Sequence, residues 1–204
     1  LTAGKAAARG FDRGMCLMLQ GKIRLERQDW EGADHTLRAA LELFEERDGR
    51  EGIGETLLLL GRSALRQGDV EGADRLLARS REIDRQSGRS SLTSPMLCAQ
   101  AEVRAARGDT TGALNLFQQA ATLADAMSMP EALWRAQVGA AARHHEKEHY
   151  AAELACYETV LRVIKRICTH IGDAEQQLRY LGSGDRPALF RDLQSSVRDL
   201  ERAL

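Results

Sequence analysis

The segment GDVEGA, residues 68–73, recurs along the chain at a fixed distance. It is preceded by QDWEGA at residues 28–33 and followed by GDTTGA at residues 108–113. The three segments are evenly spaced, and we call the interval between neighbouring segments the repeat step. A fourth and less similar copy, EHYAAE, occupies residues 148–153, one further repeat step along. Self-similarity with a period of about 20–50 residues is the signature of repeat architectures. The sequence therefore predicts about four copies of one structural unit.

The same period holds outside this segment, which distinguishes a repeat from a chance match. Small residues recur at Gly21, Gly61, Ala101 and Ala141, and bulky residues recur at Leu37, Leu77, Phe117 and Tyr157. Apolar residues three to four positions apart flank each of them, which is the spacing of one helix face. Each copy is thus predicted to be two antiparallel helices. Gly can adopt the left-handed conformation that ends the first helix, and Asp can accept hydrogen bonds from the amides that begin the second.

This pattern also predicts the boundaries of the helices. The first helices are predicted over residues 12–27, 51–67, 93–107 and 131–147, and the second helices over 30–47, 70–86, 110–127 and 150–170. The four repeats then cover residues 12–47, 51–86, 93–127 and 131–170, with a C-terminal cap over 173–204, in a single domain spanning 1–204. Residues 1–10 are interpreted as the remnant of a preceding second helix, with Gly10 in the following turn. Together with the initial Leu1, this predicts a longer solenoid upstream.

The composition supports an all-α fold and argues against several classes of function. Only 4% of residues are aromatic and helix formers dominate, so no strands are expected. The 29 basic and 30 acidic residues nearly cancel, so no global field would hold a nucleic acid. No apolar stretch is long enough to span a bilayer. The four cysteines lack CxxC spacing, which favours reduced thiols and a cytoplasmic location over a zinc site or a disulfide framework.

The second copy carries the clearest family resemblance. The residues that carry it are Leu57, Leu60, Gly61, Ala64, Gly68, Asp69, Ala73, Leu77 and Ser80. In type and spacing they resemble the tetratricopeptide repeat family, whereas the fourth copy departs from the pattern at His149 and Glu153. The usual period of that family is about 34 residues, and a period of about 40, as in this chain, is also typical of armadillo and HEAT repeats. The spacing within each helix pair favours the tetratricopeptide type.

The resemblance implies a right-handed α-solenoid of about four helix-turn-helix repeats with C-terminal capping helices. The lengthened repeats look like those of bacterial multidomain signalling proteins, notably Ser/Thr kinases and ATPase-type transcription regulators. Residues 170–190 are similar to the closing segment of those repeat regions. Ligands of this family lie in the concave groove lined by the first helices. The resemblance places twelve residues in that groove: Met15, Met18, Lys22, Glu26, Glu55, Leu58, Arg62, Arg66, Cys98, Glu102, Arg135 and Val138.

Other side chains with chemical potential are more simply explained as surface or core. In the cluster of His144, His145 and His149, the last two stand four positions apart and could share a metal ion. No third ligand is apparent for that pair, and a polar surface is favoured. The basic edge of Arg162, Lys165 and Arg166 is interpreted as a solvated helix face. Cys16, Cys98 and Cys156 are expected to be small buried hydrophobes rather than nucleophiles. With no phosphate loop and no GxSxG elbow, we expect no enzyme activity, metal or cofactor.

The leading functional hypothesis is a protein–protein interaction scaffold or regulatory module that binds a protein or peptide segment in its groove. It would belong to a larger bacterial signalling protein, and its partner could lie in another protein or in the same polypeptide. One alternative is a module that homodimerises through an uncapped first repeat and Phe11 or Trp134. A further alternative is a ligand-sensing domain that controls an attached effector.

Overall fold

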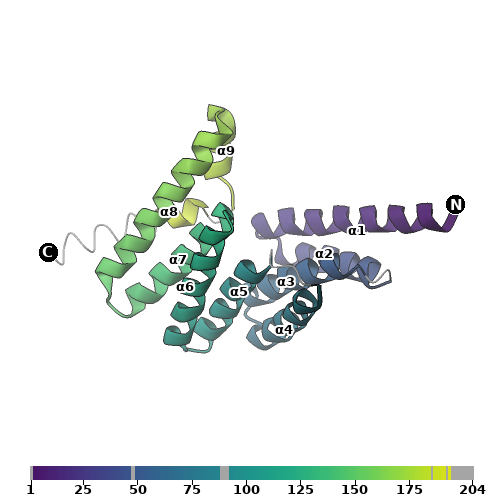
Figure 1. The fold of residues 1–204 in the computed structure, drawn as a ribbon, viewed down its shortest axis with the longest axis horizontal. Helices are drawn as coiled ribbons and strands as arrows, with labels where there is room; N and C mark the ends of the chain where they lie inside the picture. Colours follow the sequence, from purple (N-terminus) through teal and green to yellow (C-terminus); the bar gives the residue numbers. More distant parts are fainter. Residues whose placement is uncertain (1, 47–48, 88–91, 185, 192, 194–204) are drawn as a thin grey trace. The chain divides into compact units, whose positions relative to one another are not determined.

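The computed structural model describes residues 2–46, 49–87, 92–184, 186–191 and 193. Within these residues the chain is all-helical and contains no strand, as the composition predicts (Figure 1). The chain forms two compact units, which are described separately: an N-terminal unit, Leu1–Val103, and a C-terminal unit, Arg104–Leu204. The prediction of one continuous solenoid over 1–204 concerns how these units join, and it stays a prediction.

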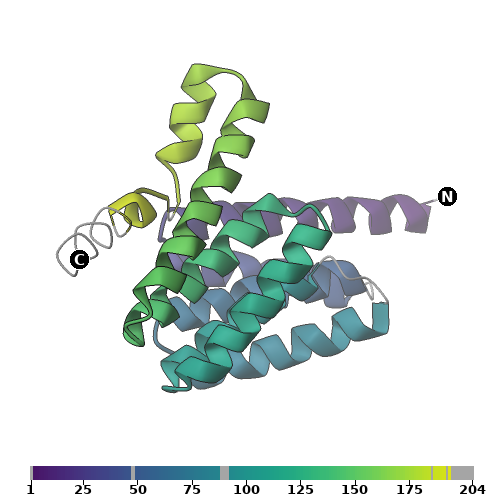
Figure 2. The same cartoon turned by 60° about the vertical axis from the view of Figure 1, so that its left-hand side comes forward.

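Within each unit the helices pack consecutively along the chain (Figure 1). The first five are α1 (Thr2–Glu26), α2 (Trp30–Glu45), α3 (Arg50–Arg66), α4 (Val70–Ser87) and α5 (Thr93–Ala106), whose last turn falls in the C-terminal unit. The C-terminal unit continues with α6 (Thr110–Ala126), α7 (Pro130–Glu146), α8 (Tyr150–Ile171) and α9 (Ala174–Leu181). The predicted boundaries of the eight repeat helices are close to these, apart from the start of α1. Helices such as α3 and α4, or α7 and α8, lie side by side (Figure 2).

The start of α1 corrects the sequence interpretation. α1 runs without interruption from Thr2 to Glu26, so the turn predicted at Gly10 is wrong. The stretch before Gly10 is rich in alanine, the strongest helix former, and no proline stops the helix. One glycine costs only about 1 kcal/mol inside a helix, which does not end it. Residues 2–10 are therefore the first turns of α1.

The turns within the repeats confirm the predicted left-handed residue. Gly68 and Gly108 both have φ of 82°, and at the same place in their repeats Gln28 has φ of 62° and Glu148 has φ of 57°. Three of the following helices are capped by aspartate. The Asp29, Asp69 and Asp109 carboxylates accept hydrogen bonds of 3.0, 2.8 and 2.8 Å from the amides of Gly32, Gly72 and Gly112. His149 provides no such side-chain cap to α8.

Replacing Gln28 or Glu148 with glycine is expected to stabilise the protein. A side chain in the left-handed conformation costs roughly 1–2 kcal/mol, which glycine avoids, although glycine also gives the unfolded chain more freedom. We expect a net gain of about 0.5–1 kcal/mol for each variant, measured as a shift in the urea midpoint. Gly68→Ala is the matched control: nothing lies within 4 Å of its added Cβ, so its loss of stability would report the backbone alone.

In the N-terminal unit the helix pairs approach closely at the predicted small residues. A Cβ on Gly21 would lie 2.5 Å from Leu37 Cγ, and a Cβ on Gly61 would lie 2.9 Å from Leu77 Cγ. One core cluster joins α1, α2 and α3 around Leu37, and a second joins α3, α4 and α5 around Leu77. Glycine at these positions thus lets a leucine of the paired helix pack against the helix backbone.

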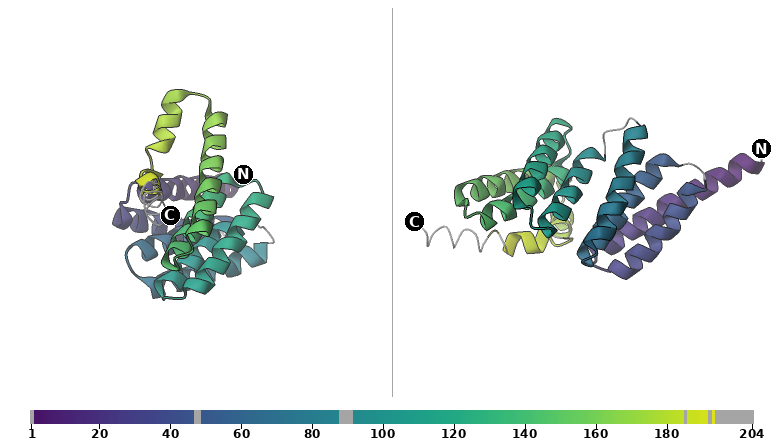
Figure 3. Two further views of the ribbon diagram at one scale, coloured as in Figure 1. Left: turned by 90° about the vertical axis from the view of Figure 1, so that its left-hand side faces the viewer. Right: turned by 90° about the horizontal axis from the view of Figure 1, so that it is seen from below.

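In the C-terminal unit, residues after α8 pack against the start of α7. α9 folds back beside the C-terminal end of α8 (Figure 3). The Tyr180 hydroxyl donates to Glu131 Oε1 at 2.7 Å, and Trp134 Nε1 donates to Glu131 Oε2 at 2.9 Å. The Arg186 guanidinium stacks 4.0 Å from the centre of the Tyr180 ring, and Leu189 is buried. Burial and the hydrogen bond to Glu131 raise the Tyr180 pKa, so this contact stays intact at neutral pH.

Candidate functional site

The structure separates the twelve predicted groove residues into core and surface. Met18 is 3% exposed and Leu58 is 4% exposed, and each lies in one of the two core clusters of the N-terminal unit. Their assignment to a ligand groove is therefore wrong, because they present almost no surface to a ligand. The other ten are half-buried or exposed: Met15, Lys22, Glu26, Glu55, Arg62, Arg66, Cys98, Glu102, Arg135 and Val138.

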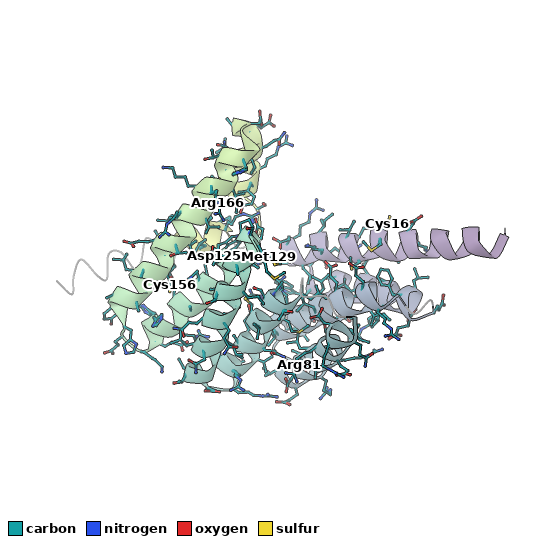
Figure 4. All side chains as sticks on the ribbon, in the orientation of Figure 1. Cys16, Arg81, Asp125, Met129, Cys156 and Arg166 are labelled. Carbon is teal, nitrogen blue, oxygen red and sulfur yellow. The ribbon has the colours of Figure 1, made fainter. Side chains whose placement is uncertain are left out.

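A cavity of about 670 Å³ lies in the C-terminal unit between α6, α7 and α8. None of the twelve predicted residues lines it. Its apolar part is formed by Ala121, Leu133, Ala140 and Val163. Its polar part is formed by Gln118, Thr122 and Asp125 on α6, Gln137 and His144 on α7, and Cys156, Thr159, Arg162 and Arg166 on α8. Figure 4 labels Asp125, Cys156 and Arg166 among these side chains.

Comparing residues that stand whole repeat steps apart, which we call the repeat register, explains why this space is open. Ala121 on α6 stands two repeat steps after Leu41, and Ala140 on α7 stands two repeat steps after Leu60. Leu60 is fully buried in the core of the N-terminal unit, and Leu41 packs against that core. The intervening copies hold Arg81 and Gln100, so alanine is the smallest side chain among the copies of each position up to this point in the chain. The sides of the cavity are helix faces, since their lining residues recur every three or four positions.

Two arginines of α8 line the cavity. Arg162 and Arg166 are exposed, and their guanidinium groups make no hydrogen bond or ion pair within the described residues. They stand four positions apart, so they lie one turn apart on the same helix face. Guanidinium groups bind carboxylates and phosphates with paired hydrogen bonds. This wall of the cavity therefore suits an anionic ligand.

The histidine and the cysteine of the cavity are in their neutral forms at pH 7. Burial, and then the nearby His149 and Lys147, lower the His144 pKa. His144 Nδ1 is buried and has no hydrogen-bond partner in the described part of the chain. Burial, and then the charge of Glu153, raise the Cys156 pKa, so its thiol stays protonated and is a poor nucleophile. The cavity thus offers a neutral imidazole and a thiol as hydrogen-bonding groups.

His145 and His149 have different surroundings and do not form a cluster with His144 that could hold a metal ion. His145 Nδ1 lies 3.1 Å from Glu153 Oε2, and the His149 ring centre lies 6.0 Å from that of His144. Among the residues described, no group of three His, Cys, Asp or Glu side chains has the geometry to hold a metal ion. Nor does any described helix combine the length and apolar character required to cross a bilayer.

The sequence analysis named four of the lining residues but did not place them in one site. His144 was considered with the other histidines, Arg162 and Arg166 as part of a basic helix edge, and Cys156 as a buried hydrophobe. The structure brings all four to one cavity. The available signal was alanine at two positions where each earlier repeat carries a larger side chain. In comparisons with known proteins, no family model and no curated sequence matches the chain. The function proposed below therefore rests on the geometry of the described residues.

Proposed function

We propose that the chain is a protein-binding module and that it binds an acidic peptide segment in the cavity between α6, α7 and α8. The observation that carries this proposal is a pair of arginines that line the cavity, Arg162 and Arg166, whose guanidinium groups have no partner in the described residues. The apolar surface of Leu133 and Val163 would receive aliphatic side chains of the same peptide. Neutral polar groups such as Gln118 would hydrogen-bond its backbone.

The module itself would be a right-handed solenoid of about four tetratricopeptide-like repeats. The regular recurrence of the left-handed residue, at Gln28, Gly68, Gly108 and Glu148, supports this architecture. Rigid helix pairs would present the binding side chains at fixed spacing, so the scaffold would lose little entropy on binding. As a wider role we propose a scaffold or regulatory segment of a larger bacterial signalling protein in the cytoplasm.

Reversing the charge of both arginines is expected to abolish peptide binding. The probe is an array of short synthetic peptides that vary in their content of Asp and Glu. Wild-type protein should bind the acidic members, with an affinity that falls as salt screens the charges. The Arg162→Glu, Arg166→Glu variant should bind them at least about tenfold more weakly, because two attractive contacts become repulsive.

Two matched double variants make this experiment specific. Arg75→Glu, Arg81→Glu makes the same change of net charge on exposed residues of α4 and should leave binding unchanged. Arg62→Glu, Arg66→Glu tests the concave groove predicted from the sequence. If only the Arg62→Glu, Arg66→Glu variant loses binding, the peptide binds on the first helices and not in the cavity. If all variants bind equally well, neither the cavity nor the concave groove is the binding site.

The volume of the cavity favours one second candidate. About 670 Å³ falls within the range of small-molecule pockets, so the cavity also suits a small anion sensed on behalf of an attached effector. Free glutamate, added as a competitor to the peptide array, separates the two. Full displacement of the acidic peptides at low glutamate concentration would favour the sensor, and no displacement would favour the peptide.

A further inference from the structure

Helix α1 has an apolar face that no other described helix of the N-terminal unit covers. Leu19 is 50% exposed and Ile23 is 52% exposed. Cys16 is also exposed, so the expectation that it is a small buried hydrophobe is wrong. These three residues are spaced three and four positions apart, so they lie along one stripe of the helix. The opposite face of α1, with Met18 and Gly21, packs on α2. We call the stripe of Cys16, Leu19 and Ile23 the α1 face.

The repeat register shows that the corresponding face is buried on later first helices. One repeat step on, α3 carries Thr56, Leu59 and Ser63, whose exposed fractions are 0%, 4% and 0%. At the next repeat step, α5 carries Met96, Ala99 and Val103, whose exposed fractions are 3%, 2% and 2%. The α1 face therefore corresponds to surfaces of α3 and α5 that are buried by packing. It differs from them because no described helix of the N-terminal unit packs against it.

On α3 and α7 the cover is the second helix of the preceding pair. Ser63 Oγ on α3 donates to the Trp30 carbonyl at the start of α2, at 3.4 Å. On α7, Gly139 stands three repeat steps after Leu19, and a Cβ there would lie 2.2 Å from the Phe117 ring of α6. The end of α3 thus meets the start of α2, so the two helices run antiparallel.

The second helices of the first three pairs share one side-chain pattern. A small residue is followed by a bulky one four positions later and by another small one three positions after that. The three examples are Ala33, Leu37, Ala40 on α2; Ala73, Leu77, Ser80 on α4; and Ala113, Phe117, Ala120 on α6. All nine side chains are buried. Leu37 and Leu77 lie against Gly21 and Gly61 of their own pairs, whereas Phe117 lies against Gly139 of the next first helix. The contact of Phe117 with the next first helix is the one that a helix on the α1 face would repeat.

We propose that the α1 face is a docking site for an amphipathic helix of this small–bulky–small pattern, bound antiparallel to α1. By the register, Leu19 would meet its bulky residue, and Ile23 and Cys16 would meet its two small residues. The site extends the interfaces already present between α2 and α3 and between α6 and α7. It is separate from the cavity of the C-terminal unit and does not depend on the function proposed for that cavity.

A synthetic copy of α2 provides the probe, because α2 covers the face of α3 whose central residue, Leu59, matches Leu19. A fluorescein-labelled peptide with the sequence of residues 29–46 should bind the full chain saturably in a fluorescence anisotropy titration. Leu19→Glu should weaken binding at least about tenfold, since it places a charge where a leucine would be buried. Leu37→Glu in the peptide should have the same effect.

The controls separate docking from unfolding and from self-association. Leu19 is half exposed, so Leu19→Glu should keep the helical circular dichroism of the wild type. Leu178→Glu on α9, where the leucine is 70% exposed, should bind the peptide normally, as should the Arg162→Glu, Arg166→Glu variant. Absence of saturable binding, or equal binding by Leu19→Glu, would overturn the proposal. Concentration-dependent light scattering that Leu19→Glu abolishes, without peptide binding, would also overturn it and assign the face to a second copy.

Discussion

Gly139→Val is expected to destabilise the protein by about 3 kcal/mol, because a side chain at this position has no room. A Cβ on Gly139 would lie 2.2 Å from Phe117 Cε1 and 2.4 Å from Phe117 Cζ. The Phe117 ring is 3% exposed, so it cannot move into solvent to make space. Overpacking a core costs about 1–3 kcal/mol, and a β-branched residue fits a helix poorly. Urea unfolding with an unchanged m-value would measure the loss.

The control and the rescue for this prediction use the repeat itself. Gly54→Ala adds a methyl group to another helical glycine, but its nearest neighbour is Leu92 Cδ1 at 3.3 Å, and we expect a change within about 1 kcal/mol. Gly139→Ala combined with Phe117→Leu recreates the alanine and leucine found at positions 99 and 77. The double variant should be more stable than the sum of the single changes predicts. Strict additivity would show that the ring does not limit the space at Gly139.

The fold could be predicted because the features that determine it are local. The left-handed residue and the aspartate cap mark each turn, and their recurrence at Gly68 and Gly108 places four helices at once. The apolar period then identifies the face that packs. The start of α1 was missed because Gly10 resembles the turn glycines, whereas the alanine-rich stretch around it continues the helix. A glycine alone does not distinguish a turn from a helix interior.

The candidate site could not be predicted in the same way, because it depends on distances between helices. Met18 and Leu58 were assigned to a groove, but neighbouring helix positions differ by about 100° in direction. An error of one position in the predicted orientation of a helix is therefore enough to place a core residue on the surface. The cavity arises from what is missing at Ala121 and Ala140, and its walls come from three helices. Sequence spacing within one helix cannot show that residues on α7 and α8 face the same space.

Glu153→Met is expected to stabilise the protein by about 1–3 kcal/mol. Glu153 is 1% exposed and stands where the three earlier repeats have the fully buried residues Ala33, Ala73 and Ala113. Its Oε2 lies 3.1 Å from His145 Nδ1, and its Oε1 has no hydrogen-bond partner in the described residues. A buried carboxylate with an unpaired oxygen carries a desolvation cost of about 1–3 kcal/mol, which an apolar side chain of similar volume avoids. Its partner His145 is half exposed, so the imidazole can bond to water after the replacement.

Two further variants test whether the buried carboxylate is the cause. Glu153→Ala should gain less than Glu153→Met, because it leaves unfilled volume. His145→Ala should lose about 1–3 kcal/mol, since it leaves the carboxylate buried without a partner, and Glu153→Met should remove that loss when the two are combined. Glu153→Met should also lower the Cys156 pKa, because the charge of Glu153 contributes to raising it; the rate of thiol alkylation against pH would show this. A Glu153→Met protein that is less stable than the wild type would contradict this prediction. It would mean that the hydrogen bond between Glu153 and His145 stabilises the fold by more than the burial of the carboxylate costs. The fourth repeat would then depend on a polar contact at the position where the first three repeats have alanine.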